Sequence, residues 1–285
     1  MINIVCIKWG TKFSSAHVNI LYRSVKKHLK KEHNFVCFTD NAKGLDSNID
    51  ARPLWHDYVT LGLNYRKLKL YSEEILSSLD YNILYLDLDT VITGSILPFA
   101  NLTENTIWKS PSNGRLGFVY NTSLVRLVDD EFCEAWSLFK KNPQQLIYKS
   151  KTIDGWTGSD QAVISHLFGN TCNHVDESHG IISLRDHNEM CSVEKLKRGI
   201  KIIGFYHNDK YGDMSDESLQ EKHPWIVQHW LSYADESDLE VLEKFKEDRK
   251  IPKERKARIA YLKKGRTRTR NTRIKKLGYV NRTVL

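Results

Sequence analysis

Two acidic residues, Asp87 and Asp89, stand one residue apart directly after an apolar run at residues 81–86. The run predicts a buried strand. Side chains alternate along an extended chain, so both carboxylates should lie on one side, with Leu88 on the other. In open α/β sheets, ligands bind at the carboxyl ends of the strands. Two neighbouring anions repel each other unless a hard cation lies between them, and Mg²⁺ or Mn²⁺ accepts such oxygen ligands. We therefore expect a divalent-metal site here.

A metal held in this way would neutralise the charge of a departing phosphate. The Asp-x-Asp pattern alone is weak, because it also occurs in solvated turns and helix caps. Its position after an apolar strand favours the metal interpretation. Residues 90–95 predict a second short strand that leads into a turn. The acid pair should therefore lie at a junction between two strands and not at the start of a helix.

The elements that must position these acids alternate between strand and helix patterns in the first half of the chain. Strands are expected at residues 2–8, 35–38, 49–54 and 81–86, and helices at 14–31 and 65–79. In the second helix, the residues Leu68, Tyr71, Ile75 and Leu79 should face inward. Such alternation predicts an α/β fold with a mainly parallel, doubly wound sheet.

The second half of the chain is less regular. The pattern predicts a strand at 115–120, helices at 122–141 and 159–168, and a strand at 201–206 that delivers His207. Two further helices are expected at 221–232 and 236–248, followed by a very basic helix from Pro252 to Gly265. Residues 266–270 have no apolar face and predict a segment that is disordered when unbound.

Charge is distributed unevenly along the chain. Residues 249–285 hold 15 Lys or Arg and one acid, which gives +14, whereas the other 248 residues carry −6. We therefore predict a main domain at 1–248 and a basic C-terminal tail, helical or disordered, at 249–285. A basic tail on an acidic body indicates an acidic partner for the tail and not a generally adhesive surface.

Several broad classes of protein are disfavoured. The first residues enter a strand pattern directly, which is not typical of a secretory signal, and no apolar stretch approaches the length of a transmembrane segment. The five cysteines are scattered and form no C-x-x-C pair. They are interpreted as reduced thiols without structural zinc, so a cytoplasmic location is expected, or host cytoplasm if the chain is phage-encoded.

Seven segments in order resemble metal-dependent glycosyltransferases of the GT-A fold, especially family 8 and related bacterial and phage proteins. They span about residues 2–230. The resemblance implies a single GT-A (Rossmann-like) domain that transfers a sugar from a nucleotide-sugar donor, UDP being the expected nucleotide, with retention of configuration. The segments are Asn3–Lys12, Phe35–Asp40, Tyr65–Leu68, Tyr81–Asp89, Phe118–Ser123, Gly158–Gln161 and Tyr206-His207.

The resemblance implies a role for each matching residue. Asp87 and Asp89 would bind the metal, Mn²⁺ or Mg²⁺, and Asp87 also the donor. His207 would be the third ligand, and its imidazole suits Mn²⁺ better. Residues near the first strand would frame the nucleotide base; they are Trp9, Gly10, Thr11 and Lys12.

The remaining implied roles concern the sugar and the diphosphate. Asp160 would contact the sugar hydroxyls, Gln161 would lie near the reacting carbon, and Asn121 would hydrogen-bond the sugar. An ordinary capped helix start at Ser159 is compatible with the first two roles. Lys67 would lie near the donor. The family's Lys-Pro-Trp-like element is not intact, so Lys210 or, less favoured, Lys222 would reach the diphosphate.

The acceptor is expected to be polyanionic because of the tail. Duplex DNA carrying a hydroxymethylated base is the favoured hypothesis, and lipopolysaccharide or another membrane glycolipid is the close alternative. The tail lacks the apolar face of a lipid-surface helix and the aromatic residues that stack on single-stranded bases. A third hypothesis is a non-catalytic nucleic-acid-binding protein on a transferase fold. The acids, the glutamine and the histidine named above argue against that third hypothesis.

Overall fold

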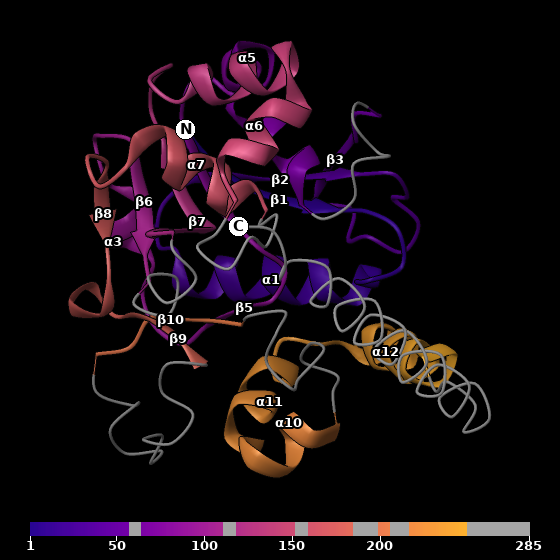
Figure 1. Cartoon of the computed structure of the whole chain (residues 1–285). Helices are drawn as coiled ribbons and strands as arrows, with labels where there is room; N and C mark the ends of the chain where they lie inside the picture. Colours follow the sequence, from indigo (N-terminus) through magenta and orange to yellow (C-terminus); the bar gives the residue numbers. More distant parts are fainter. Residues whose placement is uncertain (57–63, 111–117, 152–158, 185–198, 206–216, 250–285) are drawn as a thin grey trace, which may run out of the picture. The chain divides into compact units, whose positions relative to one another are not determined.

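A computed structural model describes residues 1–56, 64–110, 118–151, 159–184, 199–205 and 217–249. A seven-stranded sheet with the order β3-β2-β1-β4-β7-β6-β8 is the centre of the fold (Figure 1). All its pairings are parallel except those made by β7 with β4 and β6. This confirms the predicted mainly parallel α/β sheet. Its strands are β1 (Ile2–Lys8), β2 (His33–Thr39), β3 (Asp50–Pro53), β4 (Ile83–Leu86), β6 (Thr106–Lys109), β7 (Tyr120–Leu127) and β8 (Asn173–Val175).

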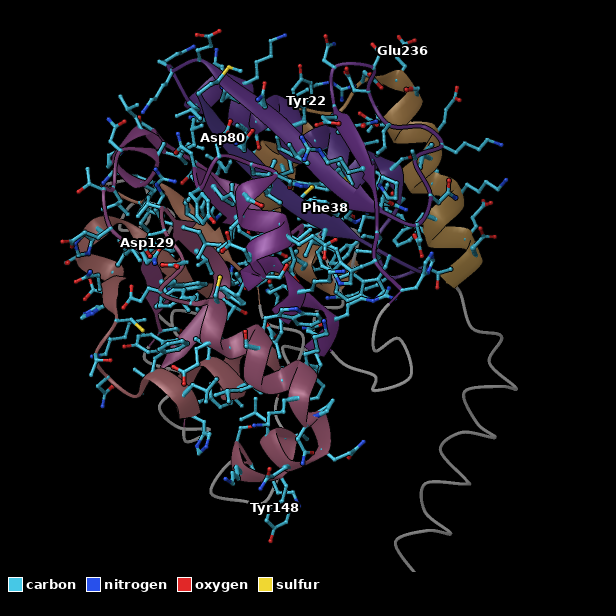
Figure 2. All side chains as sticks on the ribbon, turned by 90° about the horizontal axis from the view of Figure 1, so that it is seen from above. Tyr22, Phe38, Asp80, Asp129, Tyr148 and Glu236 are labelled. Carbon is cyan, nitrogen blue, oxygen red and sulfur yellow. The ribbon has the colours of Figure 1, made fainter. Side chains whose placement is uncertain are left out.

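The central strands form because they are apolar on both faces, as a sheet covered by helices requires. Every residue of β1 and of β4 is buried. Alternate residues belong to different apolar layers. Leu84 and Leu86 pack in the layer that includes the buried face of α1 (Ser15–His28), whereas Ile83 and Tyr85 pack in the opposite layer. Figure 2 labels one residue from each layer, Tyr22 and Phe38.

Helices cover both faces of the sheet. Figure 1 shows α1 on one side and α5 (Cys133–Lys141), α6 (Pro143–Lys149) and α7 (Asp160–Phe168) on the other. The short helix α3 (Leu97–Ala100) contributes Phe99 to the α1 layer, and η3 (Glu177–His179) precedes β9. Tyr148, near the end of α6, projects from the molecule (Figure 2) and is 68% exposed. The α5–α7 layer lies on the same side of the sheet as Tyr85, and α7 begins with Asp160.

The expected strand at 115–120 and helix at 122–141 both differ from the structure, since residues 118 and 119 are not in a strand and residues 115–117 lie outside the described residues. Residues 122–141 were predicted to be a single helix, but residues 120–127 form the buried strand β7, antiparallel to β4 and β6, and a helix begins only at Cys133. All eight residues of β7 are buried although Asn121, Thr122, Ser123 and Arg126 are polar. The Arg126 guanidinium satisfies the carbonyls of Ile83, Leu102 and Leu127. Tertiary hydrogen bonds of this kind leave no periodic pattern in the sequence.

The expected helix at 65–79 is interrupted. A 3₁₀ helix, η2 (Tyr65–Tyr71), ends at Ser72, whose extended backbone begins α2 (Glu73–Ser77). The Ser72 hydroxyl caps α2 by accepting a hydrogen bond from Ile75 N. The inward-facing set is nevertheless confirmed, since Leu68, Tyr71, Ile75 and Leu79 are all buried.

A smaller sheet and three helices complete the described part of the fold. The strands β5 (Thr90–Ile92), β10 (Ile202–Gly204) and β9 (Ile181–Ser183) pair in the order β5-β10-β9. The expected short strand after Asp89 is thus confirmed. Three helices follow, α10 (Glu217–Lys222), α11 (Pro224–Leu231) and α12 (Glu236–Arg249), and residues of the first two pack with this sheet in a third apolar cluster.

The chain divides into one compact unit, Met1–Leu242, and a second unit, Glu243–Leu285. The second unit is described only as far as residue 249, so the predicted border at 248 and the nature of the tail stay predictions. None of the described helices is long and apolar enough to cross a membrane. The cytoplasmic location also stays a prediction.

Candidate active site

The acid pair lies where the two sheets meet. Asp87 follows the last residue of β4, and its backbone N–H donates to Ser123 O at 2.9 Å. The carbonyl of Asp89 accepts from Phe205 N, just after β10, at 3.2 Å. Leu88 is 2% exposed and packs in the α1 layer. Leu88 thus lies in the core, and because residues 88 and 89 form a turn, the placement of both carboxylates on one side stays a prediction.

Asp87 is held by three side chains. Its Oδ1 accepts from Lys67 Nζ at 2.9 Å and from Tyr85 Oη at 2.5 Å, and its Oδ2 accepts from Ser123 Oγ at 2.7 Å. Burial alone would raise the pKa of this carboxyl, but the Lys67 charge and the hydrogen bonds outweigh burial and hold the pKa below its usual value. Asp87 is therefore a carboxylate that is held in place and ionised.

Lys67 connects Asp87 with the second candidate acid, Asp160. The Lys67 side chain is 2% exposed, donates to Thr122 O at 3.0 Å and lies 3.4 Å from Asp160 Oδ2. Burial would lower the pKa of Lys67, yet the charges of Asp160 and Asp87 raise it above the usual value. The amine is therefore a buried cation between two carboxylates. Its predicted contact with the donor stays a prediction, and its described contacts favour a positioning role.

Asp160 is the first residue of α7 and is fully buried. Ser159 caps the helix by accepting from Gln161 N, and Thr122 Oγ1 donates to Asp160 Oδ2. Asp160 Oδ1 makes no hydrogen bond to any described residue although it is buried. A buried carboxylate oxygen without a donor is costly, so it marks the place where a hydroxyl of a bound molecule would be favoured.

Asn121 and Gln161 extend the same cluster. Asn121 is 1% exposed, and its Oδ1 accepts from Ser123 N at 2.9 Å and from Gln161 Nε2 at 3.4 Å. The structure therefore brings five predicted site residues, from η2, β7, α7 and the position after β4, into one connected group. They are Lys67, Asp87, Asn121, Asp160 and Gln161.

Asp89 has a different environment from Asp87. Among the described side chains, its partner is Lys12, whose Nζ lies 3.5 Å from Asp89 Oδ2. Burial, and to a lesser degree the Asp87 charge, raise the pKa of Asp89 to about 6, although the Lys12 charge opposes them. A buried carboxylate with a raised pKa is stabilised in its ionised form when a cation approaches.

The residues after β1 lie at the same edge of the sheet. Gly10 has a left-handed backbone (φ +59°), and its N–H donates to Asp40 Oδ2 at 2.8 Å. The Arg66 guanidinium lies 5.7 Å from the centre of the half-buried Trp9 ring. Thr11 is exposed and Lys12 is half-buried. Among residues 9–12, Lys12 alone has a described contact with the acid pair. The predicted role of these four residues in binding the nucleotide base stays a prediction.

The Asp87 and Asp89 side chains are of the chemical type that binds a divalent cation. Asp87 and Asp89 supply hard carboxylate oxygens, the ligands that Mg²⁺ and Mn²⁺ take. The described part of the chain contains no group of three or more His, Cys, Asp or Glu residues that would complete the site. His207 and Lys210 lie outside the described residues. Lys222 ends α10, and the choice between Lys210 and Lys222 stays open.

Sequence reasoning missed three residues that hold the acids: Tyr85, Thr122 and Ser123. Tyr85 lies in β4 two residues before Asp87, so extending the alternation of the strand by one residue would have found it. The two hydroxyl residues act through the pairing of β7 with β4 and through the packing of α7. The helix wrongly predicted at 122–141 concealed both.

Comparison with known proteins agrees with this fold. No protein-family model and no curated protein sequence matches the chain. Among solved structures, the galactosyltransferase LgtC, bound to donor and acceptor sugar analogues, is 14% identical. The match covers 81% of this chain and 95% of LgtC at a TM-score of 0.58.

Two further glycosyltransferases are similar. GlyE of Streptococcus pneumoniae TIGR4 is 13% identical over 87% of this chain and 63% of GlyE, at a TM-score of 0.53. The bifunctional WbbM is 9% identical over 86% of this chain and 51% of WbbM, at a TM-score of 0.56. The chain thus has the fold of these glycosyltransferases, which confirms the predicted GT-A-like fold. Membership of family 8 stays a prediction.

Proposed function

We propose that the protein is a metal-dependent glycosyltransferase that moves a sugar from a nucleotide-sugar, with UDP as the expected nucleotide, to a hydroxyl group. The observation that carries the proposal is the buried link Asp87–Lys67–Asp160, at the edge of the sheet where α/β folds bind ligands. It joins a candidate metal ligand to an acid with an unsatisfied oxygen. The fold shared with glycosyltransferases supports the same conclusion.

Each residue then has a chemical role. Asp87 and Asp89, with His207 as the expected third ligand, would hold Mn²⁺ or Mg²⁺, and the ion would supply positive charge beside the departing diphosphate. Asp160 would accept a hydrogen bond from a sugar hydroxyl through Oδ1. Asn121 and Gln161 would orient the ring, and Lys12 would add a positive charge beside the phosphates.

We further propose that configuration is retained. The acceptor hydroxyl would attack from the side that the diphosphate leaves and would lose its proton to a phosphate oxygen of the donor. The positive charge that develops on the sugar would lie near the Asp160 carboxylate, whose negative charge favours it. Asp160 is also the nearest candidate for a covalent nucleophile.

Donor hydrolysis without an acceptor tests the activity. A panel of nucleotide-sugars is incubated with the full chain and Mn²⁺, and release of nucleoside diphosphate is measured. We expect turnover with one donor and at least a hundredfold loss in Asp160→Asn, whereas Asp130→Asn, at an exposed acid outside the cluster, keeps full activity. Absence of turnover across the panel would favour the non-catalytic nucleic-acid-binding alternative.

The acceptor is proposed to be polyanionic because the tail is basic. Deletion of residues 250–285 removes 14 basic residues and one acid, which changes the formal net charge from +8 to −5. We expect the deletion to abolish salt-sensitive retention on duplex DNA while donor hydrolysis continues. Retention only on vesicles that contain anionic glycolipid would replace the favoured DNA acceptor by the membrane glycan.

A further inference from the structure

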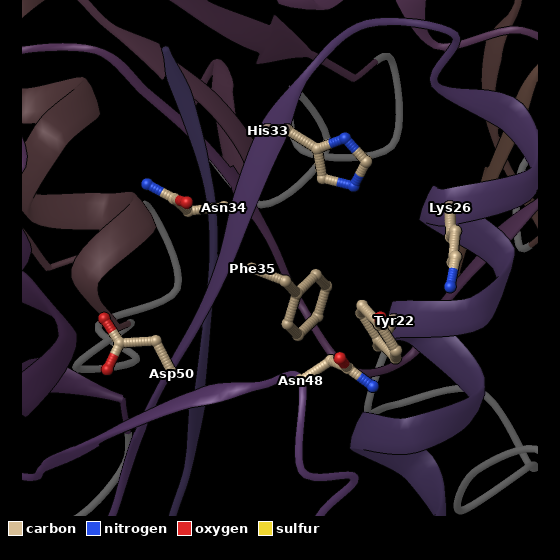
Figure 3. A pocket seen from close by; sticks show the side chains of 7 residues that line it. All are labelled: Tyr22, Lys26, His33, Asn34, Phe35, Asn48 and Asp50. Atoms are coloured by element: carbon tan, nitrogen blue, oxygen red, sulfur yellow. The ribbon is translucent and has the colours of Figure 1, made fainter.

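A pocket of about 280 Å³ lies at the edge of the sheet opposite to Asp87 (Figure 3). His33 is the first residue of β2 and Asp50 the first of β3, so the pocket adjoins the amino ends of the strands. Asp87 follows the carboxyl end of β4. The proposed sugar transfer uses none of the residues that line this pocket.

The side chains that face the pocket come from α1, β2 and the loop before β3. Figure 3 shows His33 and Phe35 on the side of β2 that faces Tyr22 and Lys26 of α1, with Asn48 beside them. The Tyr22 and Phe35 rings meet edge to face at 5.4 Å and are 8% and 3% exposed. They form an apolar floor beneath the polar groups of Lys26, His33 and Asn48.

Asp50 is the one acidic residue among the described residues that line the pocket. Asp50 points away from α1 in Figure 3 and pairs with Arg52 at 2.8 Å. Asp46, an acid near the rim, accepts hydrogen bonds from Asn48 and lies 3.7 Å from Arg23. The other polar groups that line the pocket are the Lys26 amine, the His33 imidazole and two amides, Asn34 and Asn48.

Lys26 provides the cation. It is exposed, lies 6.0 Å from the centre of the Tyr22 ring and makes no ion pair with any described acid. His33 uses Nδ1 on Lys31 O at 2.8 Å, and its Nε2 makes no hydrogen bond within the described part of the chain. Both groups are therefore available to a ligand.

The positive surface continues beyond the pocket. Lys26 also lines a second, more open hollow of about 630 Å³, together with Lys27, Lys30 and Arg23. Lys27 and Lys30 are exposed and form no ion pair with the acids that the structure describes, whereas Arg23 is neutralised by Asp235 and Asp238. An anion bound at Lys26 would thus lie beside further cations.

We propose that the smaller pocket binds a phosphorylated sugar, with the ring over Tyr22 and Phe35, the phosphate at Lys26, and a sugar hydroxyl that donates to His33 Nε2. At about 280 Å³ the pocket is slightly smaller than typical ligand cavities, which start at about 300 Å³, so it would hold one sugar ring with its phosphate outside, at the exposed Lys26. Lysine binds phosphate as a compact point charge, and the apolar floor suits the C–H face of a sugar. The proposal does not depend on sugar transfer at Asp87.

Calorimetric titration of the full chain tests the proposal with three probes: glucose 6-phosphate, glucose and inorganic phosphate. We expect glucose 6-phosphate to bind at least tenfold more tightly than either of the others. Lys26→Gln should weaken its binding at least tenfold. The matched control is Lys31→Gln, because Lys31 is an exposed lysine that donates to Asn101 Oδ1 and does not line the pocket.

The comparison of the two variants separates the pocket from the tail, since both keep all basic residues beyond 249. Equal effects of Lys26→Gln and Lys31→Gln would overturn the proposal. So would equal binding of inorganic phosphate, or a short DNA duplex that displaces glucose 6-phosphate and binds more tightly. An Asp89→Ala variant should bind glucose 6-phosphate normally, so failure of the proposed enzyme activity and failure of this site are distinguishable.

Discussion

Asp87 and Asp89 differ because their neighbours differ. Asp87 accepts hydrogen bonds from Lys67, Tyr85 and Ser123, whereas the described side-chain partner of Asp89 is Lys12 alone. The Lys67 charge and the hydrogen bonds keep the pKa of Asp87 below its usual value, whereas burial raises the pKa of Asp89. In the proposed enzyme, a bound cation would relieve the second acid.

Asp87→Asn should destabilise the protein. The substitution removes one of the two negative charges beside the buried Lys67, and breaking a buried ion pair costs about 3 kcal/mol. Urea denaturation in EDTA measures the free energy of unfolding, with Asp130→Asn as the exposed control. An unchanged free energy of unfolding in Asp87→Asn would contradict the described ion-pair geometry.

Asp89→Asn should stabilise the metal-free protein at neutral pH and not in acid. The native carboxyl keeps its proton up to about pH 6, whereas in the unfolded chain it ionises near pH 3.9. The native state therefore binds more protons between these values, and the contribution of Asp89 to stability falls as pH rises through them. The variant should gain up to about 3 kcal/mol at pH 7 and almost nothing at pH 4. Unfolding curves in EDTA at both pH values measure this difference, and an equal gain at both would refute the raised pKa.

Ser123→Ala should weaken metal binding without removing a ligand. Its hydroxyl donates to Asp87 Oδ2 at 2.7 Å and fixes the carboxylate. Loss of such an outer partner typically lowers metal affinity about tenfold or more. A titration with Mn²⁺ measures the affinity, and Ser123→Thr, which keeps the hydroxyl, should restore most of it. Equal affinities for all three proteins would show that Ser123 has no positioning role.

Residues whose role depends on local pattern could be predicted, and residues whose role depends on a partner strand could not. The position of the acid pair at the end of β4 follows from the apolar run that precedes it. Asp160 and Gln161 follow from a serine cap at a helix start. Ser123 reaches Asp87 only because β7 runs antiparallel beside β4. That pairing joins segments far apart in the sequence, and no local pattern records it.

At the scale of elements, the errors fall where tertiary contacts replace local propensity. The polar residues at 121–127 resemble the exposed face of a helix, but they are buried in β7. Arg126 donates a hydrogen bond to Ile83 O of β4, and Asn121 Oδ1 accepts one from Gln161 of α7. The segment 65–79 has a helical apolar period, yet it bends at Ser72. The bend ends η2, and α2 begins as a separate helix. Lys67 of η2 contacts Asp87 and Asp160.

Ser72→Ala distinguishes the observed break from a continuous helix. Alanine is the best helix former, so the change would be neutral or stabilising inside one long helix. Because the Ser72 hydroxyl caps α2, we expect a loss of about 1 kcal/mol in the free energy of unfolding. Thermal or urea denaturation measures it. Ser77→Ala, at the exposed end of α2, is the matched control, and a gain in stability for Ser72→Ala would favour the uninterrupted helix.

At the scale of the whole molecule, the sequence indicated a mainly parallel sheet and a charge-divided chain, and the sheet is confirmed. Strand order, the reversed strand β7 and the second sheet depend on long-range pairing, which composition does not reveal. The central claim is that neighbouring acids at the end of β4 hold a divalent ion that assists departure of a nucleoside diphosphate.

Donor turnover at a fixed protein concentration tests that claim most directly when it is followed in Mn²⁺, then in excess EDTA, and then with Mn²⁺ restored. We predict turnover in Mn²⁺, none in EDTA and full recovery on restoration, with Asp89→Ala inactive throughout. Turnover that continues unchanged in EDTA, or an Asp89→Ala variant as active as the unmodified chain, would contradict the account.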